Sequence, residues 1–356
     1  MIADADHGRE NNFNLLRMAA ATTVMVSHAG PIALGRGVPE PLEVATGYTM
    51  GVGAVIVFFA ISGYFITKSF DRRASLADFA LARASRIFPG LIVALLFTAF
   101  VLGPFFTTLS IGQYLAQRDT WTYAPQNALL VHQQFALPQV FASNPFAGVA
   151  NGPLWTLKYE VACYLGVVIA GFLGLSRPKF MPLLLTIAAA AMIITPGANM
   201  NLSARVAIIC GAFAFGAGVY VYRRRVPISV TLAILLAAAA VVSRQTHFFP
   251  LFYAISLGYA ALIFGFANFP VIRQYNRLGD YSYGMYIYAL PISQAVCASV
   301  PKIGTWGVVA FGFPIALTLA MISWTCIEGP ALRHRHWLAA RVRLSRSHRE
   351  TATVRA

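Results

Sequence analysis

Arg17 and His28 are the first residues of this sequence whose types and spacing suggest chemistry. Both lie in the stretch LLRMAAATTVMVSHAG (15–30), which is otherwise apolar. They are separated by about three turns of an α-helix, so both side chains project from nearly the same face, roughly 16 Å apart along the axis. A neutral imidazole can take the proton of an attacking hydroxyl, and ionisable residues within apolar helices usually face a cavity. The alternative is that Arg17 extends to the membrane surface and His28 caps the helix.

Arg83 and Arg86 form a second candidate group in FALARASRIFPG. At a spacing of three residues they share one helix face, and a pair of guanidinium forks matches the oxygens of a phosphate. The alternative is that they are the positively charged flank of a membrane helix.

Three further polar positions could belong to a site. Ser62 precedes Gly63 in the middle of FFAISGYFITK, where close helix packing is the alternative explanation. Glu160 in NGPLWTLKYE is a carboxylate that could orient or balance the imidazole of His28, or could form a salt bridge with Lys158 or Arg205. Asp280 and Ser282 are candidate helix caps, and Glu328 ends the last apolar segment.

The composition requires that these residues sit in a membrane protein. The chain has 356 residues, of which 58% are hydrophobic and only 11% are charged, whereas a soluble domain carries roughly 25% charged residues. We therefore expect an all-α, polytopic bundle of about ten transmembrane helices. The expected segments are 13–29, 50–67, 89–106, 155–175, 181–195, 203–222, 228–242, 250–268, 281–299 and 305–327.

The distribution of Lys and Arg predicts the orientation of the bundle. With the N-terminus inside, 20 of the 27 basic residues fall in inner stretches and four in outer ones, which places both termini in the cytoplasm. The net charge of +15 then reflects topology and anionic membrane lipids, and no nucleic-acid partner. We divide the chain into a membrane domain (1–330) and a basic cytoplasmic tail (331–356). The outer loop 107–154 could pack on sugar rings or cover a site.

The motifs, taken in order, resemble those of the acyltransferase 3 family of membrane O-acyltransferases. The similar elements are the Arg17–His28 spacing, FFAISGYFI, ARASRIFP, GPLWTLKYE, LGDYSYGMYIYALP and IEGPALR, which together cover nearly the whole chain. Many members of the family carry a histidine where this chain has Ala289.

The resemblance implies transfer of an acyl group, which is acetyl in the best-known members, from cytoplasmic acyl-CoA to a hydroxyl of an exported polysaccharide, lipopolysaccharide or lipid-linked glycan. It implies a multi-pass protein of the plasma membrane or inner membrane. Arg83, Arg86 and Ser62 would bind the donor, Arg17 would guide it, and His28, with Glu160, would act in catalysis. No metal and no permanently bound cofactor is expected. The alternatives are a ten-helix transporter and an acyltransferase that acts on a small molecule or a lipid.

Overall fold

The computed structural model describes residues 1–6, 8, 10–72, 75–195 and 201–334. These residues fold into helices joined by turns and loops, with no strand beyond one isolated bridge between Thr107 and Val140. The long helices are α2 (Phe13–Leu34), α4 (Met50–Asp71), α5 (Leu76–Phe97), α9 (Leu157–Phe172), α10 (Met181–Ile194), α11 (Leu202–Val221), α12 (Val230–Val242), α13 (Phe249–Phe266), α15 (Ser282–Ser299) and α16 (Thr305–Ser323).

Shorter helical elements connect or extend these helices. They are α1 (Ile2–Ala5), α3 (Glu43–Thr46), α6 (Gly103–Phe106), α7 (Ile111–Ala116), α8 (Arg118–Leu129), α14 (Pro270–Arg273), the π-helical turns η1 (Thr98–Leu102) and η4 (Trp324–Glu328), and the 3₁₀ turns η2 (Pro153–Thr156) and η3 (Gln274–Arg277).

The all-helical fold class is confirmed, and the helices are those of a multi-pass membrane protein. In the described chain, six helices are long and apolar enough to cross a membrane, at Met50–Asp71, Leu76–Phe106, Pro153–Phe172, Leu202–Val221, Phe249–Phe266 and Thr305–His334. α10 and α12 are apolar but shorter, and polar residues lower the hydropathy of α2 and α15. Ten membrane spans therefore stay a prediction, as does the cytoplasmic placement of both termini. The division into domains is likewise untested, because residues 335–356 of the expected tail lie outside the described ranges.

Polar side chains at the helix starts fix where several helices begin. Thr49 accepts a hydrogen bond from the Val52 amide at the start of α4. Ser75, Asn201 and Ser229 play the same part for α5, α11 and α12. Each cap satisfies one main-chain N–H that has no partner within its own helix.

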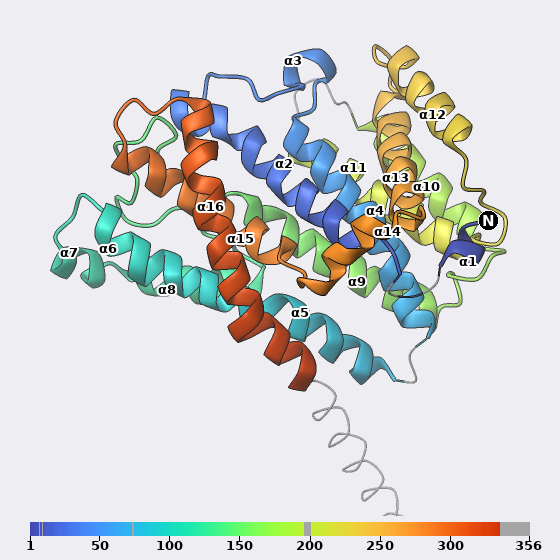
Figure 1. Cartoon of the computed structure of the whole chain (residues 1–356), viewed down its shortest axis with the longest axis horizontal. Helices are drawn as coiled ribbons and strands as arrows, with labels where there is room; N and C mark the ends of the chain where they lie inside the picture. Colours follow the sequence, from blue (N-terminus) through green and yellow to red (C-terminus); the bar gives the residue numbers. More distant parts are fainter. Residues whose placement is uncertain (7, 9, 73–74, 196–200, 335–356) are drawn as a thin grey trace, which may run out of the picture.

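α2 and α4 run through the middle of the molecule, with α10, α12 and α13 to one side and α6, α7 and α8 to the other (Figure 1). α4 packs against α11 with main chain on main chain. A Cβ atom on Gly63 would lie 2.0 Å from the carbonyl oxygen of Phe213, and one on Gly216 would lie 2.0 Å from that of Ala60. Glycine at both positions thus permits the close approach that apolar helices use in a membrane.

A non-helical stretch, 144–152, enters the bundle alongside α15. Asn144 donates a hydrogen bond to Gln294, and Asn151 donates one of 2.8 Å to the carbonyl of Ile287. Pro291 has no N–H with which to satisfy that carbonyl four residues earlier. The side chain of Asn151 therefore replaces a missing helical hydrogen bond, and the stretch ends at η2, which leads into α9.

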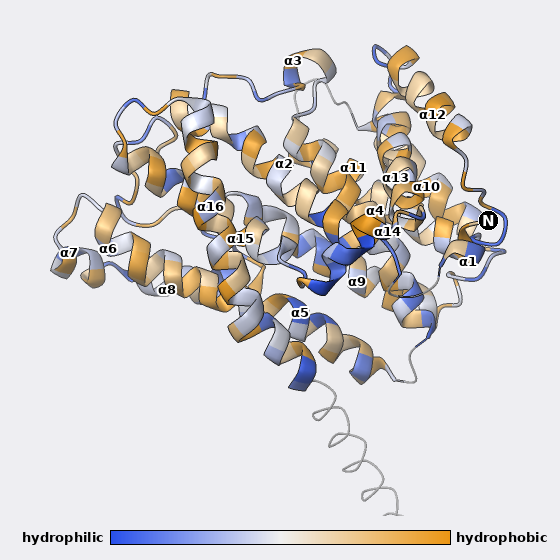
Figure 2. Ribbon diagram, in the orientation of Figure 1, coloured by the Kyte–Doolittle hydropathy of each residue, from blue (hydrophilic) through white to orange (hydrophobic). Residues whose placement is uncertain are grey.

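Figure 2 shows that the long helices consist mostly of hydrophobic residues, whereas hydrophilic residues gather in connecting segments and around α14 and the start of α15. The hydrophilic residues around α14 and the start of α15 lie next to the cavity described below.

Candidate active site

A cavity of about 560 Å³ lies between α2, α4, α5, α9 and the start of α15. This volume falls within the range of sites that bind small molecules. Five of the six residues that the sequence singled out line it, although they come from four separate helices: Arg17, Ser62, Arg83, Arg86 and Glu160. Asp280 also lines the cavity. The sixth candidate, His28, is not among the lining residues.

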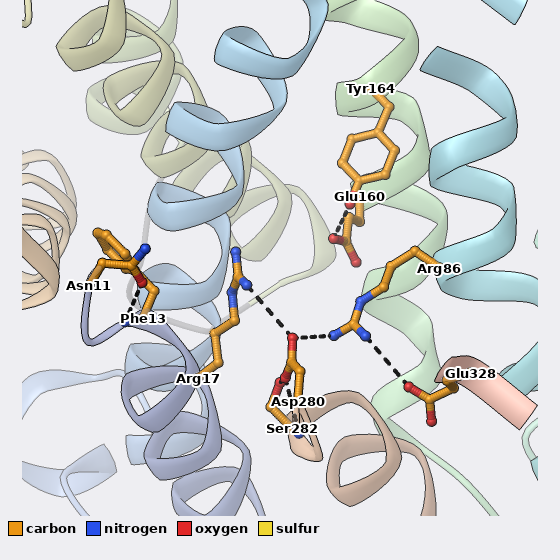
Figure 3. A network of polar contacts seen from close by, with 9 residues as sticks. All are labelled: Asn11, Phe13, Arg17, Arg86, Glu160, Tyr164, Asp280, Ser282 and Glu328. Carbon is orange, nitrogen blue, oxygen red and sulfur yellow. Dashed lines mark hydrogen bonds and ion pairs between the residues drawn. The ribbon is translucent and has the colours of Figure 1, made fainter. Parts of the chain in front are cut away.

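Asp280 lies between two guanidinium groups in the cavity wall (Figure 3). Its Oδ2 is 2.6 Å from Nη2 of Arg86 and 3.8 Å from Nη1 of Arg17. Its other oxygen, Oδ1, accepts hydrogen bonds from the main-chain N–H and the hydroxyl of Ser282. The carboxylate is thus held at the first turn of α15. The expected capping role of Asp280 and Ser282 is wrong, because Tyr281 is the N-cap of this helix and no side chain caps it.

Arg86 also interacts with a second carboxylate. Its Nη1 lies 3.6 Å from Oε2 of Glu328, and Oε1 of Glu328 accepts a 2.8 Å hydrogen bond from Ser323. Glu328 ends the π-helical turn η4, in which Trp324 lies 5.7 Å from the guanidinium of Arg86. Turns of this kind often occur at functional sites, because the extra residue redirects the side chains that follow.

Ser62 and Gly63 point to different neighbours although they are adjacent. Gly63 packs against α11, which confirms the close-packing explanation for this residue, while Ser62 lines the cavity. Glu160 lines the cavity from α9 and accepts a hydrogen bond from the hydroxyl of Tyr164, one helical turn further on. Arg83 lines it from α5.

His28 belongs to a second polar group, nearer the end of α2. Its Nδ1 lies 2.9 Å from Oε1 of Glu40, and Ser27 donates a hydrogen bond to Oε2 of the same carboxylate. The Ser27 hydroxyl in turn accepts a 2.8 Å hydrogen bond from the Gly51 amide. If Nδ1 carries the proton toward Glu40, the lone pair of Nε2 is free to act as a base.

The pKa of the Glu40 carboxyl is lowered in this arrangement. Burial by itself would raise the pKa of this carboxyl, but the hydrogen bond and the charge of His28, together with the hydrogen bond from Ser27, outweigh burial and lower the pKa below 4.5. A negative carboxylate beside Nδ1 favours the imidazolium that a general base becomes when it takes a proton.

Two helices connect the cavity with the histidine. α2 carries Arg17 in the cavity wall and His28 about 16 Å further along its axis. α4 contacts Ser27 through Gly51 and lines the cavity from Val55 onward. The two sites therefore lie along the same pair of helices.

Sequence reasoning did not identify Glu40. It lies between Pro39 and Pro41 in the connection that follows the helix of His28, and its short separation from His28 was the one available signal. Asp280 and Glu328 were noted only for their positions in or near helices. Their shared partner, Arg86, is 194 residues before Asp280, so the sequence carried no signal for the contact.

The all-helical membrane fold, the charged internal cavity and the histidine–carboxylate pair together indicate a membrane-bound enzyme. The chain matches the sequence model of an acyltransferase domain, that of the acyltransferase 3 family, over residues 10–325. It belongs to this family and is a membrane O-acyltransferase.

Two relatives are similar to almost the entire chain. An O-acetyl transferase of Shigella phage Sf6 is 29% identical over 339 residues, covering 90% of this chain and 95% of the relative. Nodulation protein 10 of Rhizobium leguminosarum bv. viciae is 28% identical, covering 94% of this chain and 96% of the relative. No solved structure matches the chain.

Proposed function

We propose that the enzyme moves an acetyl group from acetyl-CoA, bound in the cavity from the cytoplasmic side, to a hydroxyl of an exported glycan. The observation that carries this proposal is the placement, on one helix, of Arg17 in the cavity and of His28, which is paired with Glu40, about three turns away. The family and the name of the phage relative support an acetyl group.

Arg17, Arg83 and Arg86 supply the positive charge that the phosphates of the donor need. The long, flexible thioester arm of the donor suits the separation between these arginines and His28. Positive charge on the proposed inner side of the membrane adds to the attraction, since 20 of the 27 basic residues fall in those stretches. We place the protein in the plasma membrane, or the inner membrane of a cell that has two.

His28 acts as the general base in this proposal. Its Nε2 takes the proton of the acceptor hydroxyl while the hydroxyl oxygen attacks the thioester carbon. The new C–O bond forms, the C–S bond breaks, and the proton passes from the imidazole to the departing thiolate. Glu40 holds the imidazole by Nδ1 throughout and stabilises its positive charge.

The decisive experiment compares His28→Gln with Glu160→Gln in purified, full-length protein. Glutamine keeps the polarity of each side chain but cannot act as a base. We expect His28→Gln to lower kcat by about 10²–10⁴-fold while acetyl-CoA binding stays within a factor of about two. Glu160→Gln should change the KM for the donor more than kcat, because Glu160 lies in the cavity. If a well-folded His28→Gln protein keeps the parental kcat, His28 is not the base, and Glu160 becomes the candidate.

The acceptor is identified separately. Mass spectrometry of surface glycans from a deletion strain and its parent should show the loss of a 42 Da acetyl increment, the mass that one O-acetyl group adds to a hydroxyl. If the glycans are unchanged and the increment is lost from lipids or small molecules instead, those molecules are the acceptors.

A further inference from the structure

One carboxylate in the cavity wall organises two of the three arginines. Asp280 contributes a single oxygen, Oδ2, to both Arg86 and Arg17, which come from α5 and α2 (Figure 3). The side chain of Asp280 is only 12% exposed. The two positively charged guanidinium groups repel each other, and the negative charge of the carboxylate between them offsets this repulsion.

The carboxylate is held rigidly in place. Its second oxygen, Oδ1, is engaged by the main-chain N–H and the hydroxyl of Ser282 at the first turn of α15. Because a carboxylate bound through both oxygens cannot rotate freely, Asp280 determines where the two guanidinium groups lie. Its position is thereby coupled to that of α15.

The two arginines are not held equally. Arg86 has Asp280 on one terminal nitrogen and Glu328 on the other, and it lies 5.7 Å from the ring centres of both Tyr283 and Trp324. Arg17 also lies 5.7 Å from a ring centre, that of Phe65, but it approaches Asp280 only to 3.8 Å, which is longer than a hydrogen bond. Arg86 is therefore the fixed member of the pair, and Arg17 keeps its hydrogen-bonding capacity for an incoming anion.

We propose that Asp280 is a positioning residue for the donor: it holds Arg17 beside the fixed Arg86 so that both guanidinium groups present N–H donors to one phosphate group of acyl-CoA. Asp280 acts through the arginines and does not touch the donor. This inference rests on the proposed binding of acyl-CoA in the cavity, and it adds a residue whose role the family resemblance did not supply.

The test uses two donors that differ in their phosphates. Acetyl-CoA carries the nucleotide phosphates, whereas S-acetylpantetheine has the same thioester arm without them. Dissociation constants are measured by calorimetry on full-length protein in detergent, for the parent, Asp280→Asn and Asp280→Glu. Asp119→Asn, at an exposed position in α8, is the matched control.

We expect Asp280→Asn to weaken acetyl-CoA binding about tenfold or more, as the loss of one charge-assisted hydrogen bond would. Binding of S-acetylpantetheine should change less than about twofold, Asp280→Glu should restore part of the affinity for acetyl-CoA, and Asp119→Asn should match the parent. A role in folding alone would weaken both donors equally, and that result would overturn the inference. Tighter binding of acetyl-CoA by Asp280→Asn would overturn it too, since Asp280 would then compete with the phosphate.

Ser282→Ala covers the case in which Asp280→Asn does not fold. It removes one hydrogen bond from Oδ1 and should weaken acetyl-CoA binding in the same selective way but by less. Parental affinity in a folded Ser282→Ala protein would contradict the anchoring step. If the parent itself binds no acetyl-CoA while its glycan transfer persists with another donor, the donor in the proposed function is wrong, and this inference falls with it.

Discussion

His28 and Glu40 are joined by a contact of 2.9 Å between Nδ1 and Oε1, and the two residues belong to a helix and to the connection that follows it. The pair places a carboxylate against Nδ1 of the imidazole and leaves Nε2 for the proposed proton transfer. The proposed base and its carboxylate partner are therefore close in the sequence, whereas the cavity is built from helices that are far apart in it.

Glu40→Gln should lower both activity and stability. The variant keeps the size of the side chain but loses a charge-assisted hydrogen bond, about 1.5–3 kcal/mol, which corresponds to roughly 10- to 100-fold in kcat if the contact persists in the transition state. Rate measurements at saturating donor test the first expectation. An unchanged kcat would mean that Glu40 only closes the connection over α2.

The stability effect of Glu40→Gln should depend on pH. The pKa of Glu40 is lowered in the folded protein, so its stabilising contribution is fully present above the ordinary value of 4.5 and is lost as the pH falls through the lowered pKa. The Tm values of parent and variant should therefore differ at pH 7 and converge in acid. A difference in Tm that stayed constant down to pH 3 would assign the effect to packing.

Asn151 and Pro291 should be energetically coupled. Asn151→Ala leaves the buried carbonyl of Ile287 without a partner, at a cost of about 1–3 kcal/mol. Pro291→Ala supplies an N–H that can close the helical hydrogen bond, so Asn151→Ala should cost less in that background, with a coupling of roughly 0.5–3 kcal/mol. The free energies of unfolding of the parent, the two single variants and the double variant, measured in detergent, give this coupling. If Asn151→Ala costs the same in both backgrounds, Asn151 does not have this role.

Gly63→Ala should destabilise the contact between α4 and α11. The added methyl group would lie 2.0 Å from the carbonyl oxygen of Phe213, and relieving such overlap costs about 1–3 kcal/mol or more. Gly166→Ala in α9 is the control, because nothing lies within 4 Å of its added Cβ and alanine favours a helix. We expect a lower Tm for the first variant and an equal or higher Tm for the second. Equal shifts would show that α4 and α11 can separate at no cost.

The predicted orientation is tested by labelling. Single cysteines at Gln117 and Arg225, both exposed, would be introduced after the four native cysteines are replaced. An impermeant thiol reagent applied to intact cells should label position 117 and not position 225. The reverse pattern would invert the topology and remove the argument for a cytoplasmic donor.

The positions of the long helices could be predicted from the sequence because each apolar segment is recognisable from its own residues. A helix lies in each segment that the sequence indicated, with ends that differ by a few residues, except that α5 begins at Leu76 and not near 89. Five of the six candidate residues line one cavity. The partners of those residues could not be predicted in the same way. The contact between Arg86 and Asp280 spans 194 residues, and only packing of the helices brings the two together.

Glu40 illustrates a different limit. It lies outside every apolar segment, so no hydropathy pattern draws attention to it, and its contact with His28 depends on how the connection folds back over α2. Glu160 was expected to orient the imidazole of His28, or to form a salt bridge with Lys158 or Arg205, but its hydrogen-bond partner is Tyr164. The carboxylate next to His28 is that of Glu40.

The stretch 144–152 has a consequence for the order in which the protein is assembled. Asn144 and Gln294 are 150 positions apart, and Asn151 and Ile287 are 136 apart. Because synthesis proceeds from the N-terminus, the stretch leaves the ribosome long before the helix that will accept its hydrogen bonds exists. The hydrogen bonds that hold the stretch inside the bundle can therefore form only after α15 has been made. A nascent chain interrupted before residue 282 would thus already contain Arg17, Arg86 and Glu160, and still have no finished wall to hold a substrate.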